Sequence, residues 1–306
     1  MQSVEALRRK ISGAQDLLDV VKTMKVLAAV NIRHYEQAVA SLIHYDRTIE
    51  LGLQAILRQP DAPVPPLAAG DALHRGLIVF GSDQGLCGQF NERLIDFCVA
   101  EVPPAGDPAL PCQLLAIGER ATALLQESGY VVNATLATPS SLSGVLPLVQ
   151  ELLVRIDQWR TIGQFGQVSL IYNRPNAGRT YRTVRVSLLP LDRTWLIQLR
   201  NGHWDSRSLP ALTLPWAEVF ASLVRQHLFV ALYRACAESL ASEDASRLAA
   251  MQNAERNIQK RLDGLTMAYH HRRQHAITAE LLDIVSGFEA VQQEEEAHAH
   301  GFVRTR

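Results

Sequence analysis

The distribution of proline divides this chain of 306 residues into three parts. All fourteen prolines fall between Pro60 and Pro215. A proline inside a helix removes a backbone hydrogen bond and costs about 3 kcal/mol, so the two flanks can be long helices and the middle cannot. The expected parts are helices over 1–59 and 211–291, a proline-rich linker over 60–71, a mixed domain over 72–210 and a flexible tail over 292–306.

Residues 1–59 carry an apolar repeat of seven. One series is Leu7, Ala14, Val21, Ala28, Tyr35, Leu42, Ile49 and Ile56, and its companion is Val4, Ile11, Leu18, Lys25, Ile32, Val39, Asp46 and Leu53. Only Lys25 and Asp46 interrupt the pattern. A seven-residue repeat of this length is typical of a helix that packs along a second helix with a left-handed supercoil.

The C-terminal flank has a similar but less regular apolar pattern, which runs through Ile258, Leu262, Leu265, Tyr269, Ala276, Ile277, Leu281, Ile284, Phe288 and Val291. Two long helices at opposite ends of one chain, each with an uncovered apolar seam, satisfy each other by pairing. Because the chain returns through the middle domain, we expect an antiparallel coiled coil in which the longer C-terminal helix extends beyond the first.

The middle of the chain alternates strand and helix patterns. Apolar runs at 76–82, 113–118, 167–174 and 182–191 read as strands, and 91–101, 119–128 and 140–160 read as helices. This alternation predicts a Rossmann-like α/β domain with a mainly parallel sheet.

Charge and cysteine content exclude several functional classes. Thirty basic and thirty-one acidic residues give a net charge of −1, without the basic excess of a nucleic-acid-binding protein. The four cysteines show no C-x-x-C pair, so we expect free thiols in a reducing compartment. No apolar stretch is long enough to span a membrane.

The stretch GSDQGLCGQF (81–90) raises the possibility of a nucleotide site, because a glycine-rich turn between strand and helix can hold a phosphate. Its glycines, Gly81, Gly85 and Gly88, match neither the dinucleotide fingerprint nor the P-loop. Cys87 has no histidine or aspartate context that would make it a nucleophile. A structural turn is the favoured interpretation, and a nucleotide-dependent enzyme stays as the alternative.

The basic end of the C-terminal flank provides no catalytic or metal-binding pattern. His271 and His275 have the spacing of a zinc pair, but Arg272 and Arg273 lie between them and repel a cation. We therefore expect no catalytic, cofactor or metal site. From Arg256 to His275 a single acidic residue, Asp263, stands against five basic ones, which are Arg256, Lys260, Arg261, Arg272 and Arg273. This cationic surface favours contact with an acidic partner.

Several motifs resemble those of the gamma subunits of F-type ATP synthases. VKTMKVLAAVNIR (21–33) is similar to the family's N-terminal signature, and GSDQGLCGQFN (81–91) resembles its S/T-D-R-G-L-C-G motif. SEDASRLAAMQNAERN (242–257) and RRQHAITAELLDIVSGFEAV (272–291) resemble its C-terminal signature. The matches occur in the family's order and cover both ends and the middle.

The resemblance implies a non-catalytic central-stalk rotor subunit. Such a subunit couples a proton- or sodium-driven membrane ring to the catalytic beta subunits, and its partners are the alpha and beta hexamer, the epsilon subunit and the c-ring. The implied location is peripheral, on the cytoplasmic face of a bacterial inner membrane. The partner-contact positions that it implies are Lys22, Met24, Lys25, Arg273, Gln274, Thr278 and Glu280, with 281–291 as an apolar tip.

Three departures from the family pattern point to a divergent bacterial member. Lys25 stands where the family is usually acidic, Gln84 replaces the usual arginine, and 257–259 reads Asn-Ile-Gln. A coiled-coil scaffold unrelated to energy coupling is the remaining alternative.

Overall fold

The structure, a computed structural model, describes residues 3–59, 62, 74–102, 104, 112–162, 165–176 and 179–302. It divides the chain into two compact units, Met1–Met24 with Met251–Arg306, and Lys25–Ala250. The helices α1 (Val4–Leu57) and α6 (Trp216–Phe302) each contribute to both units. The expected linker over 60–71 lies outside the described residues apart from Ala62.

The larger unit contains one sheet in the order β3-β2-β1-β4-β5. Its strands are β1 (His74–Phe80), β2 (Cys112–Ile117), β3 (Val132–Leu136), β4 (Phe165–Asn176) and β5 (Arg179–Leu189). Neighbouring strands are parallel except β4 and β5, which are antiparallel. The mainly parallel α/β fold expected from the sequence is therefore confirmed.

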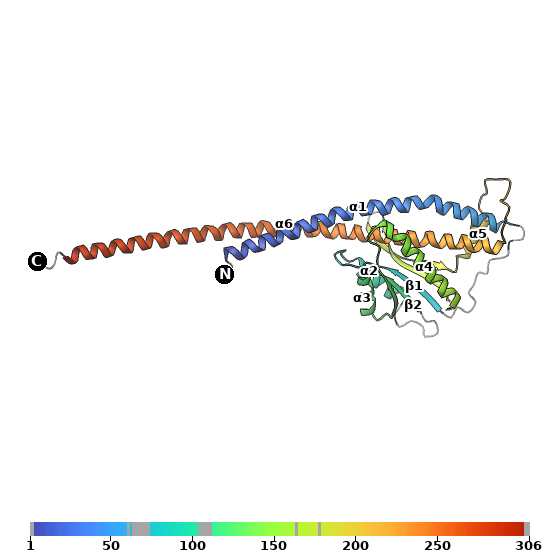
Figure 1. The fold of residues 1–306 in the computed structure, drawn as a ribbon, viewed down its shortest axis with the longest axis horizontal. Coiled ribbons are helices and arrows are strands. Elements are labelled where there is room, and N and C mark those ends of the chain that lie inside the picture. Colours follow the sequence, from blue (N-terminus) through green and yellow to red (C-terminus); the bar gives the residue numbers. More distant parts are fainter. Residues whose placement is uncertain are drawn as a thin grey trace. The chain divides into compact units, whose positions relative to one another are not determined.

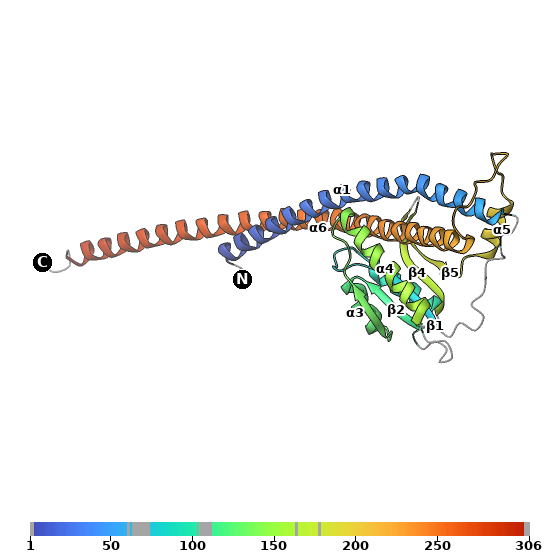
Figure 2. The ribbon, with the colours of Figure 1, turned by 45° about the vertical axis from the view of Figure 1, so that its right-hand side comes forward.

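Each face of the sheet has its own apolar core, as expected for parallel strands that are covered on both sides. On one face, Leu77 and Val79 of β1 pack with α2 (Phe90–Glu101) and α3 (Glu119–Glu127). On the other, Ile78 and Phe80 pack with α4 (Leu142–Ile162). Figures 1 and 2 show α2 and α3 on the opposite side of the sheet from α4.

The core on the α4 face also includes the two long helices. Tyr35, Ile49 and Leu53 of α1 and Leu228 and Leu232 of α6 belong to the same buried cluster as α4 and the sheet. The part of the helix pair within Lys25–Ala250 therefore forms one compact unit with the α/β layers.

Within the larger unit α1 and α6 run antiparallel and side by side (Figures 1 and 2). Tyr45 donates a hydrogen bond of 2.7 Å to Gln226, and Asp46 pairs with Arg234 at 2.7 Å. Along the whole of α1, every position of the two heptad series is buried or partly buried. The seam predicted from the seven-residue repeat is present.

The smaller unit contains the ends of the same two helices. Leu7 and Leu18 of α1 and Met251 and Leu262 of α6 are buried there. From Arg273 to Phe288 every described side chain of α6 is exposed.

Several element boundaries differ from those expected. The strand β3 and the helix α5 (Arg193–Asn201) were not anticipated, and α6 begins at Trp216 rather than 211. The helix itself continues to Phe302, past residue 291. Residues 303–306 of the expected tail lie outside the described residues.

Candidate functional site

The α6 positions for which the resemblance implies partner contact are exposed. Arg273, Gln274, Thr278 and Glu280 all lie in the segment where the described side chains are solvent-accessible. Thr278 donates its hydroxyl hydrogen bond to the backbone carbonyl of Gln274 at 2.9 Å, within its own helix. These side chains are available for contact with another molecule.

The same segment exposes large apolar side chains. They are Ile277, Leu281, Leu282, Ile284, Val285 and Phe288, exposed by 48% to 65%. They lie within about three turns of α6, and no other described part of the chain packs over them. A contiguous apolar surface of this kind marks an interaction site.

The candidate positions on α1 lie at different depths. Lys22 is exposed and sits 3.9 Å from Asp19, one turn earlier. Met24 and Lys25 are each partly buried. Lys22 and Met24 belong to the smaller unit and Lys25 to the larger one.

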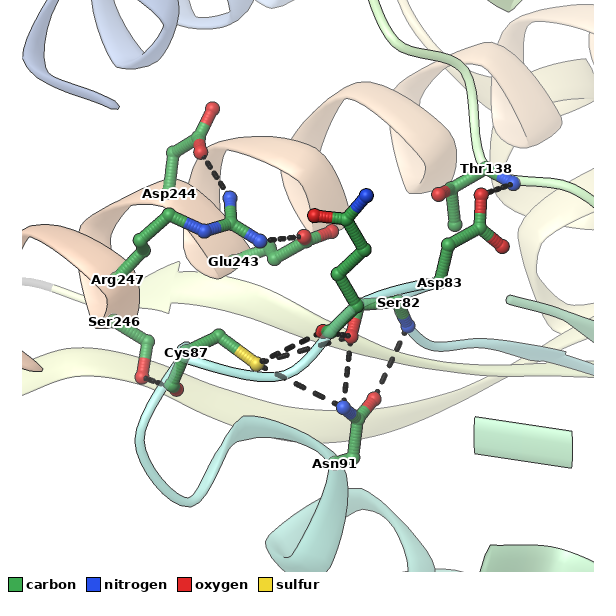
Figure 3. A network of polar contacts seen from close by, with 10 residues as sticks. Ser82, Asp83, Cys87, Asn91, Thr138, Glu243, Asp244, Ser246 and Arg247 are labelled. Atoms are coloured by element: carbon green, nitrogen blue, oxygen red, sulfur yellow. Dashed lines mark hydrogen bonds and ion pairs between the residues drawn. The ribbon is translucent and has the colours of Figure 1, made fainter. Parts of the chain in front are cut away.

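The turn GSDQGLCGQ at the carboxyl end of β1 is held by a buried polar network, drawn in Figure 3. Asn91 accepts a hydrogen bond from the backbone amide of Ser82 at 3.1 Å and donates one to its hydroxyl at 2.7 Å. Ser82 in turn donates to the carbonyl of Gln84 at 2.7 Å. Leu86 and Gly88 both have φ of 62°, the left-handed region that reverses the chain here.

This turn also fixes the start of α3. The carboxylate of Asp83 accepts hydrogen bonds from the backbone amides of Glu119 and Thr138, each at 3.0 Å. A carboxylate at a helix N-terminus satisfies a free amide and is favoured by the helix dipole. Asp83 therefore acts as a remote cap.

Helix α6 packs against the carboxyl end of β1. From β1 the sheet continues to β2 and β3 on one side and to β4 on the other, so the strand order switches between the parallel strands β1 and β4. Open α/β sheets bind ligands at such a point. Here Ser239 donates to the carbonyl of Phe80 at 3.4 Å, and Ser246 donates to the carbonyl of Cys87 at 2.5 Å. The turn thus contacts and positions α6, which agrees with the interpretation of this glycine-containing stretch as a structural turn.

Beside the turn lies an ionic cluster that the sequence reasoning missed. Arg247 pairs with Asp244 at 2.5 Å and with Glu243, and all three residues line a hollow of about 230 Å³ next to Asp83. Burial raises the pKa of Glu243 to about 7, although the positive charge of Arg247 acts to lower it. Burial raises the pKa of Asp244 as well. The spacing of Glu243 and Asp244 from Arg247, i,i+4 and i,i+3, indicates ion pairs in the sequence. Their burial depends on the turn after β1, which is distant in the sequence.

No group of histidine, cysteine or acidic residues suited to a metal ion occurs among the described residues. His271 and His275 are exposed on α6. Of the helices that the structure describes, none has an apolar stretch long enough to cross a membrane.

Comparisons with known proteins agree with this architecture. A family model described as ATP synthase matches residues 3–291. The ATP synthase gamma chain of Synechococcus sp. (strain PCC 6716) is 30% identical over 319 residues, which cover 95% of this chain and 100% of that one. That of Nostoc punctiforme is 29% identical over 318 residues, with the same shares covered.

Solved structures show the same fold. A chain of the Euglena gracilis mitochondrial ATP synthase assembly in rotational state 3 superposes with a TM-score of 0.63 at 17% identity, covering 95% of each chain. A chain from the rotor of the same enzyme in rotational state 1 gives a TM-score of 0.60 at 15% identity, covering 90% of this chain and 98% of that one. With the family model matching nearly the whole length and relatives covered from end to end, the chain belongs to the family of ATP synthase gamma chains.

Proposed function

We propose that the chain is the central rotor shaft of an F-type ATP synthase and performs no catalysis itself. It would turn with the membrane c-ring and the epsilon subunit inside a hexamer of alpha and beta subunits. Rotation presents different faces of the shaft to each beta subunit, which couples the angle of the shaft to nucleotide affinity. The location that follows is peripheral, on the cytoplasmic face of a bacterial inner membrane.

The main support for this proposal is the exposed segment of α6 from Arg273 to Phe288. A helix that exposes six large apolar side chains between Ile277 and Phe288 is not stabilised by its own chain. An apolar sleeve on a surrounding hexamer would cover it. The polar positions just before it, Arg273 and Gln274, would then meet the beta subunits.

The test is assembly followed by coupling. The full chain, co-expressed with alpha and beta subunits, should co-purify with them, and ATP hydrolysis by the membrane complex should drive ion pumping. The variant R273A/Q274A should lower the ions pumped per ATP while the complex still assembles. The control R120A removes an exposed arginine of α3, away from α6, and should pump normally.

Two other outcomes would favour the alternatives. A chain that never joins such a complex, or that tolerates R273A/Q274A without loss of coupling, would indicate a scaffold unrelated to energy conversion. Saturable binding of ATP or NAD to the isolated chain, measured by calorimetry, would indicate a nucleotide-dependent enzyme.

Lys25 provides a separate test of the N-terminal contact. If its charge meets an acidic loop of a beta subunit, K25E reverses that interaction and should change coupling more than assembly. Unchanged pumping per ATP in K25E would remove Lys25 from the coupling surface and leave the rotor proposal intact.

A further inference from the structure

The segment between α5 and α6 is tied to the end of α1. Residues 202–215 contain no helix or strand. Gln54 of α1 and the two residues that follow this helix donate hydrogen bonds to carbonyls of the segment and of the last turn of α5. The bonds are Gln54 to His203 (3.0 Å), Arg58 to Gly202 and to Arg200 of α5 (2.8 Å), and Gln59 to Pro210 (3.0 Å). These bonds give the segment a defined shape without regular secondary structure.

Beside this segment lies an open hollow of about 470 Å³, which is also lined by the end of α5 and by Arg58, the residue after α1. Its lining includes three arginines, one aromatic ring and two hydroxyls: Arg58, Arg200, Arg207, Trp204, Ser206 and Ser208. Trp204 donates its indole N–H to the carbonyl of Ser208 at 3.1 Å, and the guanidinium of Arg58 lies 6.0 Å from the centre of the Trp204 ring. The ring is therefore fixed as one wall.

The charge in this hollow is uncompensated. Among the described residues, the guanidinium groups of Arg200 and Arg207 form no hydrogen bond or ion pair, and no carboxylate lines the hollow. Asp205 is the one acidic residue within residues 200–209, and its carboxylate lies 3.1 Å from His203.

Helix capping explains part of this charge but not all of it. Arg58 bonds to carbonyls at the end of α5, and Arg200 lies in the last turn of α5, where a cation is favoured by the dipole. Arg207 belongs to no helix, and among the described residues its guanidinium donates no hydrogen bond to a helix carbonyl.

We propose that this hollow is a binding site for a phosphate group. Guanidinium groups bind phosphate through paired, charge-assisted hydrogen bonds. Arg200 and Arg207 supply the free guanidinium groups, and Ser206 and Ser208 supply hydroxyl donors beside them. The volume leaves room for the molecule that carries the phosphate. A rotor shaft needs no such ligand, so the site is independent of the proposed function.

The phosphate group could come from a soluble molecule or from the headgroup of an anionic phospholipid, and two probes separate these sources. The first is titration calorimetry of the full chain with inorganic phosphate. The second is co-sedimentation with vesicles of phosphatidylcholine, with and without phosphatidylglycerol. Both use R200Q/R207Q as the test variant and R120Q/R193Q as the control, which removes two exposed arginines elsewhere in the larger unit.

Binding of either probe should weaken at least about tenfold in R200Q/R207Q, because two charge-assisted contacts are lost, and should be unchanged in the control. R207Q alone, outside any helix, should show part of the loss with an unaltered melting temperature. Binding to phosphate without vesicles identifies a soluble source, and binding to phosphatidylglycerol vesicles alone identifies the headgroup. Absence of both, or an equal loss in the control, overturns the site.

Discussion

Asp46 of α1 and Arg234 of α6 face each other across the helix pair, with 2.7 Å between Oδ2 and Nη2. Asp46 occupies a position of the heptad series that is otherwise apolar. The side chain of Asp46 is 20% exposed and that of Arg234 33%, so each charge depends on the other for much of its compensation. An interruption in the sequence pattern therefore marks a cross-helix ion pair.

Removal of one partner of this pair should destabilise the chain. D46A leaves Arg234 partly buried without its carboxylate, and the free energy of unfolding should fall by about 1–3 kcal/mol. The double variant D46L/R234M replaces the pair with apolar contacts and should recover most of that loss. Urea unfolding of both variants checks this. A lower free energy of unfolding in D46L/R234M than in D46A would show that the ion pair itself is stabilising.

The buried amide of Asn91 should be essential to the turn after β1. N91A leaves the backbone amide and hydroxyl of Ser82 without their buried partner, which should cost about 1–3 kcal/mol. Hydrogen exchange should also accelerate at Ser82. The control Q89A alters an exposed neighbour and should change neither; equal effects in the two variants would count against the network.

The stability of the chain should depend on pH through Glu243. Its pKa is raised from 4.5 to about 7 on folding, so the folded state binds more protons than the unfolded state between these values. Its contribution is present below pH 4.5 and is lost as pH rises to about 7. The charged groups that act on it are Arg247, Asp244 and Asp83.

Unfolding of wild type and E243Q at pH 5 and pH 8 tests this. The loss of stability from pH 5 to pH 8 should be smaller in E243Q, because its amide does not titrate. Identical pH slopes in the two proteins would show that Glu243 is already ionised at pH 5. The lowered pKa of His227 acts in the opposite direction and is common to both proteins.

The four thiols should separate into two reactivity classes. Cys112 is exposed, whereas Cys87, Cys98 and Cys236 are buried. Burial raises the pKa of Cys98 and of Cys236 to about 12, so neither forms a thiolate at pH 8. A thiol reagent should therefore label one group in the native chain, and C112S should abolish that fast phase. Rapid labelling of a second thiol in C112S would contradict the buried placement.

The sequence predicted the long elements well because their signals are local and repeated. The seven-residue repeat predicts the seam of α1, and the proline distribution separates the helices from the sheet. The strand β3 was missed because its five residues, VNATL, hold few strongly apolar side chains. The helix α5 has nine residues and depends on a single cap, Asp192, which accepts from the amide of Thr194 at 2.8 Å.

The contacts around the turn after β1 could not be predicted in this way. Cys87 and Ser246 are 159 positions apart, and only the fold brings the carbonyl of one to the hydroxyl of the other. The partner-contact positions on α6 came from a resemblance, and their role stays a prediction until coupling is measured. The exposure of Arg273 and Gln274 is compatible with that role and equally with a scaffold.

The shared core of α1, α4, α6 and the sheet has a mechanical consequence. Leu53 of α1, Leu152 of α4 and Leu232 of α6 are fully buried in one cluster with Ile78 of β1. A twist applied to the sheet cannot be absorbed by sliding at this interface without opening a close-packed interior. Within residues 25–250 the helices and the sheet should consequently turn as one stiff body, and torsional compliance has to reside elsewhere in the chain.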